Sequence, residues 1–240
     1  MSVIDPQALT ASLQRLAGRG TADELLPTLR AVVDACVDLF GVSGAGIMLA
    51  DEQNMTRYVA ASDGPGRILE VIESETGQGP CTQAFVTNQI VPSSDVTTDS
   101  RWPRLATLIR PHGVRAVLGV PIALGGAPVG TLDVYLTEPH EWTPGEHAAL
   151  SRYGDVVEAA LGASLSAHRA GELAEQLQYA LDYRVVIERG IGYLMARDHL
   201  DQVSAFNQLR RAARNSQRKV GDVAEHLLAT GELPGAQGNR

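Results

Sequence analysis

The sequence predicts an α+β fold, in which helices pack against an antiparallel sheet and a helical region follows. Two observations carry this prediction. Short apolar segments separated by turn-forming residues are typical of strands, and two pairs of them occur in the first two thirds of the chain. Longer segments with apolar residues three or four positions apart are typical of amphipathic helices, and these flank the strand pairs and fill the C-terminal third. Helices and strands in this order favour an antiparallel sheet over a regular βα alternation.

The sheet domain is expected to span residues 21–165, after a short polar lead at 1–20. Its first helix runs from Thr21 to about Phe40, and Thr21 with Glu24 fits a capping box. The other expected elements are strands at 45–50 and 57–61, helices at 65–73 and 81–88, an extended segment at 90–92, a helix at 102–112, strands at 114–124 and 129–136 around a Gly-Gly turn, and a helix at 144–166.

Three amphipathic helices are expected within residues 184–232. Their apolar faces are formed by Ile187, Ile191, Leu194 and Met195, then by Val203, Phe206, Leu209 and Ala213, and then by Val220, Val223, Leu227 and Leu228. Asp201 suits the N-cap of the second helix, Gly221 or Asp222 opens the third, and Gly231 closes it. Three helices of this size can bury one small shared core.

Residues 166–183 are expected to form a helical coiled-coil linker between the two parts. Leu173, Leu177, Ala180, Arg184 and Ile187 are spaced alternately by four and three residues, which fits a seam of about two heptads. The seam predicts a homodimer with linker helices side by side. Residues 233–240 are expected to be a disordered tail.

Charge is distributed unevenly along the chain. The whole sequence carries a formal net charge of -8, but residues 181–220 hold eight basic against four acidic side chains. Arg210, Arg214 and Arg218 are four residues apart and would share one helix face, with Arg211 beside them. Because a guanidinium matches phosphate and stacks on bases, this face is a candidate nucleic-acid contact; the alternative is a solvated arginine-rich surface.

Composition excludes several classes of protein. A hydrophobic content of 44% with 20% charged residues is that of an ordinary globular chain. We find neither an apolar run long enough to span a membrane nor a signal peptide, so a cytoplasmic protein without membrane partners is expected. The scattered histidines form no pair with metal-ligand spacing, and no metal site is expected. Gly77 to Pro80 lacks the Gly-Lys-Ser/Thr end of a phosphate-binding loop.

No catalytic motif stands out. Asp95, Asp99 and Asp133 are conceivable catalytic carboxylates, but the first two lie in a loop where aspartate commonly caps or turns. Cys81 heads a short helix, where a helix N-terminus can lower the pKa of a thiol. It is a candidate redox sensor or ligand anchor, the alternative being a small buried hydrophobe, whereas Cys36 lies on an apolar helix face. The sequence therefore predicts a protein that is not an enzyme.

Residues 20–165 resemble a GAF domain. The resemblance rests on Gly79-Pro80-Cys81 with Ala84, on Val91, on Asp95 and Asp99-Ser100-Arg101-Trp102-Pro103, and on Gly113-Val114-Arg115, Val120-Pro121-Ile122 and Gly130-Thr131-Leu132. It implies a small-molecule pocket between the sheet and the short helices, with an unidentified ligand.

The C-terminal helices resemble an ANTAR domain, an RNA-binding antitermination module of bacterial regulators. The matching residues are Ala180-Leu181-Asp182-Tyr183-Arg184, Ile187-Glu188, Gly192-Tyr193-Leu194-Met195, Ala205-Phe206, Leu209-Arg210, Ala212-Ala213-Arg214 and Asp222-Val223-Ala224. The family usually has a lysine where this chain has Ile191.

Together, the two resemblances imply a regulator in which a GAF sensor controls an ANTAR domain. That domain would bind paired RNA hairpins in a nascent transcript, keep a terminator from forming and so promote antitermination. The expected RNA-binding residues are Arg184, Arg210, Arg211, Arg214 and Arg218. The alternative is a ligand-binding signalling module whose helical tail contacts a protein partner.

Overall fold

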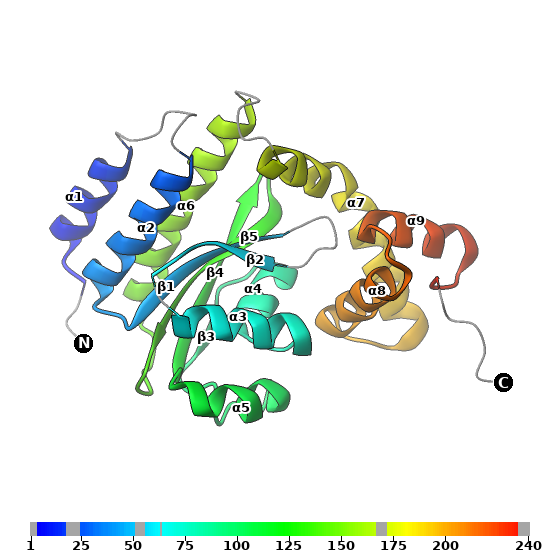
Figure 1. Ribbon diagram of the computed structural model, residues 1–240, viewed down its shortest axis with the longest axis horizontal. Coiled ribbons are helices and arrows are strands. Elements are labelled where there is room, and N and C mark those ends of the chain that lie inside the picture. Colours follow the sequence, from blue (N-terminus) through cyan, green and yellow to red (C-terminus); the bar gives the residue numbers. More distant parts are fainter. Residues whose placement is uncertain (1–3, 18–24, 51–55, 63, 167–171, 235–240) are drawn as a thin grey trace.

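The chain forms an N-terminal α+β domain and a C-terminal helical bundle that lies against its side (Figure 1). The computed structural model describes residues 4–17, 25–50, 56–62, 64–166 and 172–234. Within them, the predicted fold class is confirmed: one antiparallel sheet with helices on both faces, followed by three helices.

The sheet has five strands in the order β2-β1-β5-β4-β3, and neighbouring strands are all antiparallel. The strands are β1 (Gly44–Ala50), β2 (Thr56–Ala61), β3 (Val91–Ser93), β4 (Ala116–Leu124) and β5 (Ala127–Leu136). β1, β4 and β5 are almost continuously buried, because helices cover both of their faces. The positive φ angles of Gly125 and Gly126 provide the tight turn between β4 and β5.

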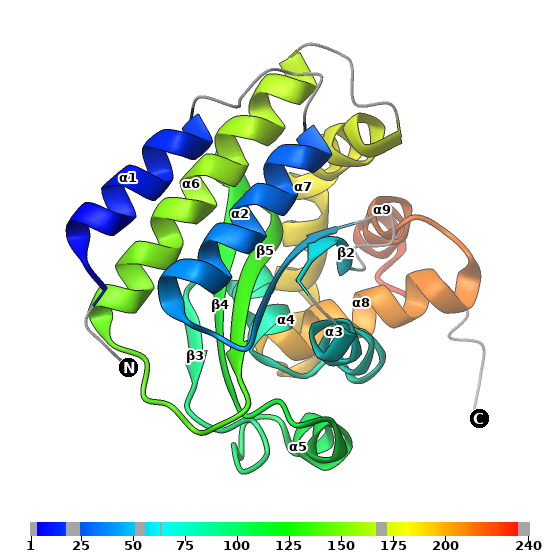
Figure 2. The same cartoon turned by 60° about the vertical axis from the view of Figure 1, so that its left-hand side comes forward.

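One face of the sheet is covered by α1 (Pro6–Ala17), α2 (Leu25–Phe40) and α6 (Pro144–Ser166). Figure 2 shows these three helices side by side. Leu29, Val33, Leu150 and Tyr153 are fully buried between α2, α6 and the sheet. This is the largest apolar cluster of the described residues, and it fixes the sheet from behind.

Helix α1 lies where a polar lead was expected at residues 1–20. Asp5 accepts a hydrogen bond from the amide of Gln7 at 2.9 Å and so caps the helix, and Pro6 is its first residue. Leu9, Leu13 and Leu16 are spaced by four and three residues and pack against the core. The lead is therefore part of the folded domain, and its apolar spacing was the signal that identifies it.

The other face of the sheet is covered by α3 (Gly64–Thr76), α4 (Pro80–Thr87) and α5 (Pro103–Ile109), with a 3₁₀ turn at Arg110–His112. Leu69, Ile72, Trp102, Leu105 and Ile109 are buried here against the strands. A second apolar cluster thus occupies the space between the sheet and the short helices.

The bundle consists of α7 (Glu172–Asp198), α8 (Gln202–Ser216) and α9 (Val220–Thr230). Asp201 is the N-cap of α8, as predicted, and accepts a hydrogen bond from the amide of Ser204 at 2.8 Å. Helix α9 begins at Val220 with Lys219 as its cap, rather than at Gly221 or Asp222. The absence of a side chain at Gly221 lets α9 pack closely against α7, because a Cβ atom there would lie 2.2 Å from the ring of Tyr183.

The second half of the expected linker and the first bundle helix are one helix, α7. The side chains of Leu173, Leu177 and Ala180 lie outside the described residues, as do the Thr21–Glu24 cap and most of the expected tail at 233–240. The dimer seam thus stays a prediction at these positions, whereas Ile187, which the spacing assigned to the seam, is 5% exposed and packs inside the bundle and its junction. None of the helices in the described ranges is long and apolar enough to cross a membrane.

We expect α1 to be held by a measurable hydrogen bond. The buried hydroxyl of Tyr153 donates to Oγ of Ser12 at 2.7 Å. In a double-mutant cycle of Tyr153→Phe and Ser12→Ala, the coupling free energy should be about 1 kcal/mol, measured by urea denaturation. Additive effects of the two substitutions would show that this bond does not stabilise the domain.

Candidate functional site

A cluster of polar side chains is buried between the sheet and α4. Glu73 at the end of α3, Cys81 at the start of α4 and Asp133 on β5 are each 3% exposed or less. They lie within the face of the domain where the GAF resemblance implies a pocket. The sequence analysis named Cys81 and, among conceivable carboxylates, Asp133; the structure brings these two together and adds Glu73.

Glu73 caps the N-terminus of α4 from inside the domain. Its carboxyl oxygens accept hydrogen bonds from the amides of Cys81 at 3.3 Å and Thr82 at 2.6 Å. Gly79, with φ of 150°, makes this approach possible, because a Cβ atom there would lie 2.1 Å from the Glu73 carboxyl carbon. A side chain on α3 therefore fixes the position of α4.

Burial raises the pKa of all three groups. The pKa of Glu73 rises to about 7, chiefly by desolvation, although the bonds from Thr82 and Cys81 oppose the shift. Desolvation also raises the pKa of Asp133 and of Cys81 well above their ordinary values, and for Cys81 the charges of Asp133 and Glu73 add to it. The Cys81 thiol is thus held protonated, which weakens the hypothesis of a reactive redox thiol.

One carboxyl oxygen of Asp133 receives no hydrogen bond from a nitrogen or oxygen donor of the described residues. Its Oδ2 accepts a hydrogen bond from the hydroxyl of Thr131 at 2.7 Å, whereas Oδ1 is buried, and the Cys81 thiol lies beside the carboxyl. Gly119 on β4 lies opposite Asp133 in the sheet register, and a Cβ atom there would be 3.0 Å from Oδ1. Because its raised pKa keeps the carboxyl protonated, Oδ1 can carry the proton and donate a hydrogen bond to an acceptor of a ligand. An aspartate alternating with apolar residues inside a buried strand was the sequence signal for it.

Asp95 and Asp99 are structural, as the sequence predicted. Asp95 accepts hydrogen bonds from Thr97 and from the guanidinium of Arg115, which holds the pKa of its carboxyl well below the usual range. Asp99 accepts bonds from Arg101 and Ser93. Both carboxylates order the loop between β3 and α5. Within the described residues, no group of three or more His, Cys, Asp or Glu side chains is placed to hold a metal ion.

The five arginines predicted to bind RNA have different environments. Arg211 and Arg214 are exposed on α8. Arg184 is half-buried, and its Nε donates to Glu188 at 2.8 Å, the pair that their spacing predicts. Arg218 lies beyond the end of α8, because Gln217 adopts a left-handed conformation, and it donates to the carbonyl of Asp222. The prediction that Arg218 shares a helix face with Arg210 and Arg214 is therefore wrong.

Arg210 is directed at the N-terminal domain. It is only 4% exposed, and one of its terminal nitrogens donates to the carbonyl of Ser74 in the last turn of α3 at 2.9 Å. Two other side chains of α8 make bonds of the same kind: Asn207 donates to the Gly77 carbonyl at 2.8 Å and Gln202 donates to the Val86 carbonyl at 2.9 Å.

Ile191, which stands where the family has a lysine, lies in the junction between the domains. It is 8% exposed and belongs to an apolar cluster that joins Ile187 and Phe206 of the bundle to Phe85 and Val86 of α4. The rings of Phe85 and Phe206 meet edge to face, with centroids 5.9 Å apart. The bundle is thus docked through an apolar contact surrounded by hydrogen bonds.

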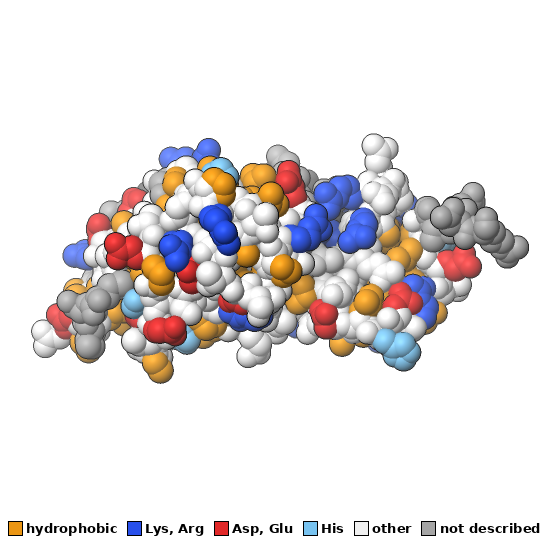
Figure 3. Space-filling view, turned by 90° about the horizontal axis from the view of Figure 1, so that it is seen from below, with side chains coloured by type: hydrophobic (Ala, Val, Ile, Leu, Met, Phe, Trp, Pro, Cys, Tyr) orange, Lys and Arg blue, Asp and Glu red, His pale blue; other side chains and the backbone are white. Residues whose placement is uncertain are grey.

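A cleft of about 1010 Å³ opens beside this junction. Its polar walls come from both domains and include Gln78, Gln83, Arg101, Arg104, Asn207 and Arg211. The face of the molecule seen in Figure 3 carries Lys and Arg side chains on both sides of the junction. Basic groups of the N-terminal domain therefore neighbour the exposed part of the arginine face of α8.

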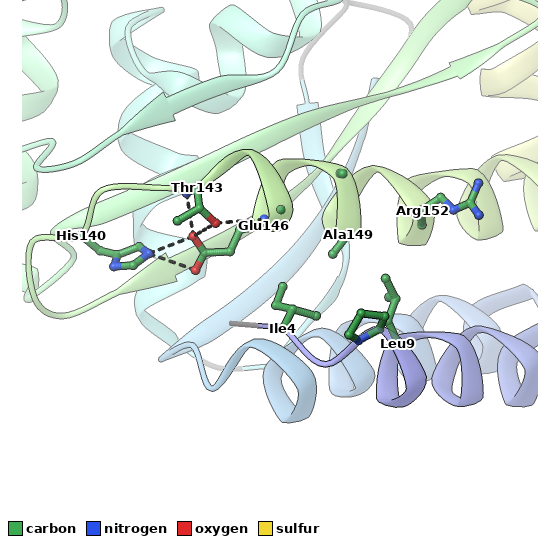
Figure 4. Close-up of a pocket in the computed structure, with 10 residues that line it drawn as sticks. Ile4, Leu9, His140, Thr143, Glu146, Ala149 and Arg152 are labelled. Atoms are coloured by element: carbon green, nitrogen blue, oxygen red, sulfur yellow. Dashed lines mark hydrogen bonds and ion pairs between the residues drawn. The ribbon is translucent and has the colours of Figure 1, made fainter. Parts of the chain in front are cut away.

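A second groove, of about 710 Å³, lies between α1 and α6 on the far side of the molecule. Figure 4 shows Ile4 and Leu9 facing Ala149 across it. At the end of the groove, the carboxylate of Glu146 accepts hydrogen bonds from His140 and from the amide and hydroxyl of Thr143. These bonds cap the N-terminus of α6. None of the predicted site residues lines this groove, and we assign it no role.

An antiparallel sheet domain with a buried polar site, joined to three helices with an arginine-rich surface, is the build of a two-domain regulatory protein. The chain belongs to the GAF domain family, whose model matches residues 24–161. The model of the ANTAR domain matches residues 175–228, which lie in α7, α8 and α9. Both predicted resemblances are confirmed.

Solved structures share the fold of the N-terminal domain. The GAF domain of an Acinetobacter phosphoenolpyruvate-protein phosphotransferase is 19% identical, with a TM-score of 0.53 over 71% of this chain and 99% of that chain. Free methionine-R-sulfoxide reductase from Neisseria meningitidis, in complex with its substrate, is 18% identical, with a TM-score of 0.53 over 67% of this chain and 89% of that one.

The phycoerythrobilin-bound GAF domain of a cyanobacterial phytochrome is 16% identical, with a TM-score of 0.57 over 67% of this chain and 97% of that one. At these identities the likeness concerns the fold alone. Among curated proteins, no match was found.

We expect the buried carboxyl of Glu73 to make the stability of the GAF domain depend on pH. Folded Glu73 keeps its proton to about pH 7, whereas the unfolded chain loses it near the ordinary value of 4.5. The folded state thus binds more protons in this window, so the free energy of unfolding should fall as pH rises, by at most about 1.4 kcal/mol per pH unit from this group.

Denaturant titrations of Glu73→Gln between pH 4.5 and 7 should lack this part of the slope. Glu75→Gln, on the exposed neighbouring residue, is the matched control and should keep the wild-type slope. An unchanged slope in Glu73→Gln would mean that this carboxyl ionises normally in the folded domain.

Proposed function

We propose that this protein is a bacterial antitermination regulator that binds hairpin RNA in a nascent transcript through its ANTAR domain. The observation that carries the proposal is the match of α7, α8 and α9 to the ANTAR model together with the exposed guanidinium groups of Arg211 and Arg214 on α8. Binding of the hairpins would keep a terminator from forming. Nascent bacterial transcripts are in the cytoplasm, and there we expect the protein.

The electrostatics of the two domains support this assignment of roles. Residues 1–165 carry ten basic against nineteen acidic side chains, so most of the GAF domain would repel RNA. The region at 181–220 has the opposite balance. Since phosphate neutralisation dominates nucleic-acid affinity, an RNA partner would approach on the side of α8.

The GAF domain is proposed to sense a small molecule without chemically converting it. Two relatives of this fold carry a substrate or a bilin, which is consistent with such a role. In this chain, the buried carboxyl of Asp133, which its raised pKa keeps protonated, favours a ligand with a hydrogen-bond acceptor. The apolar side chains packed around them, among them Trp102 and Leu105, favour a small one.

The proposal is tested on the two exposed arginines. Changing Arg211 and Arg214 to Ala should weaken binding of hairpin RNA of any loop sequence, because phosphate contacts are lost. The slope of log affinity against log salt should become shallower by about 0.7 per lost contact, the value for single-stranded loops. Titrations at several salt concentrations measure both quantities.

The matched control is Arg30→Ala with Arg152→Ala, which removes the same charge from exposed positions on α2 and α6. Affinity and salt slope should then stay close to those of the wild type. If the wild type and both variants bind no hairpin at low salt, the proposal fails and the alternative of a protein partner for these helices gains support.

We also propose a homodimer through the N-terminal half of α7, since two neighbouring hairpins require two ANTAR domains. Replacing Leu173 and Leu177 with Glu should bring like charges together in the seam and shift the protein to a monomer in sedimentation velocity. Val185→Glu, on an exposed position of the same helix outside the seam, is the control. A double variant that still sediments as a dimer would locate the contact elsewhere.

A further inference from the structure

The contact between α8 and the GAF domain has the features of a specific docking site. Three side chains of one helix, Gln202, Asn207 and Arg210, donate to three backbone carbonyls of the other domain. These carbonyls belong to the last turn of α3, to the turn after it and to the last turn of α4. The last carbonyls of a helix lack partners within the helix and carry partial negative charge, so they suit donors and a guanidinium.

Docking covers one of the expected RNA-binding side chains, Arg210, and leaves Arg211 and Arg214 exposed. Arg210 matches a basic position of the ANTAR pattern, yet here its guanidinium is covered by the GAF domain and satisfied by a carbonyl. The position of the family lysine is occupied by Ile191, which is buried among Phe85, Val86 and Phe206. A charged side chain at this position would be desolvated in the docked arrangement, whereas isoleucine stabilises it.

Helix α4 connects this junction with the buried polar cluster. Cys81 and Ala84 on one side of α4 are packed into the interior of the sensor, and Phe85 and Val86 on another side pack against the bundle. Glu73 holds the first turn of α4, and its neighbour Ser74 accepts the bond from Arg210. A ligand that moves α4 or the turn at residues 77–79 would therefore disturb both the buried polar cluster and the docking contacts.

We infer that the docked arrangement is a closed state, in which α4 and the end of α3 hold the ANTAR domain with Arg210 and Ile191 out of reach of RNA. The inference rests on the proposed RNA-binding function. A ligand of the GAF domain that binds the undocked state more tightly than the docked state would shift the protein toward the undocked state and so favour RNA binding.

The test opens the junction from each side in the full-length chain. Ile191→Lys inserts a charge from the ANTAR side and restores the family residue. Val86→Glu inserts one from the GAF side and adds no positive charge that could attract RNA. Both variants should increase the radius of gyration in small-angle scattering and tighten hairpin RNA binding about tenfold or more. The reason is that the apparent affinity of the wild type is its intrinsic affinity multiplied by the small fraction of molecules in the open state.

Matched substitutions at exposed positions serve as controls. Val185→Lys on α7 adds the same charge to the ANTAR domain, and Val71→Glu on α3 makes the same change in the GAF domain; the two valines are 54% and 52% exposed. Neither should change the radius of gyration, and neither should tighten binding as the junction variants do.

A double substitution that leaves the apolar junction unchanged controls for misfolding of the charged variants. Gln202→Ala with Asn207→Ala removes two docking bonds while leaving the apolar junction intact, and should tighten RNA binding roughly threefold or more. Variants that open the chain but bind hairpin RNA with wild-type affinity would overturn the inference while the proposed function stands. If neither the wild type nor any opened variant binds hairpin RNA at low salt, the proposed function itself is wrong.

Discussion

The carboxyl group of Glu73 is the contact on which the two halves of this protein depend. It reaches across from α3 to the first two amides of α4, in a space that Gly79 leaves free for it. Without this cap, a helix of 8 residues that begins with proline would have no side-chain acceptor for its first amides. The cost is a buried acid that keeps its proton to about pH 7.

The position of α4 then determines the packing on two of its sides, inside the GAF domain and against the bundle. Its inner side contributes to the apolar cluster under the sheet, and its outer side contributes Phe85 and Val86 to the contact with the bundle. The sensor and the output domain thus share an element rather than being connected only by the chain between α6 and α7. A shared helix is a short physical route for coupling two sites, because one displacement changes both sets of contacts.

Sequence reasoning succeeded where periodicity and turn residues decide the structure. The strands around Gly125-Gly126, the helix at 144–166 and the cap at Asp201 follow from local rules and are found as predicted. It failed at α1, whose few apolar residues pack against helices distant in the sequence and whose Ser12 accepts a hydrogen bond from Tyr153, 141 positions away. It also missed Glu73, since an acid on a helix surface is recognised as buried only when its surroundings are known, and it named Asp133 without its neighbours Cys81 and Glu73. The arginines of α8 look equivalent in the sequence, and only the position of the GAF domain distinguishes Arg210 from Arg211.

The docking bonds of Gln202, Asn207 and Arg210 all end on peptide carbonyls, not on side chains. The side chains at positions 74 and 86 therefore take no part in these hydrogen bonds, and the recognition they provide is of the path of the main chain. Substitutions on the GAF surface outside the apolar junction should accordingly leave these three hydrogen bonds in place. The two domains thus contribute different parts of the contact: the smaller domain supplies the hydrogen-bonding side chains, and the GAF domain supplies the apolar side chains of Phe85 and Val86.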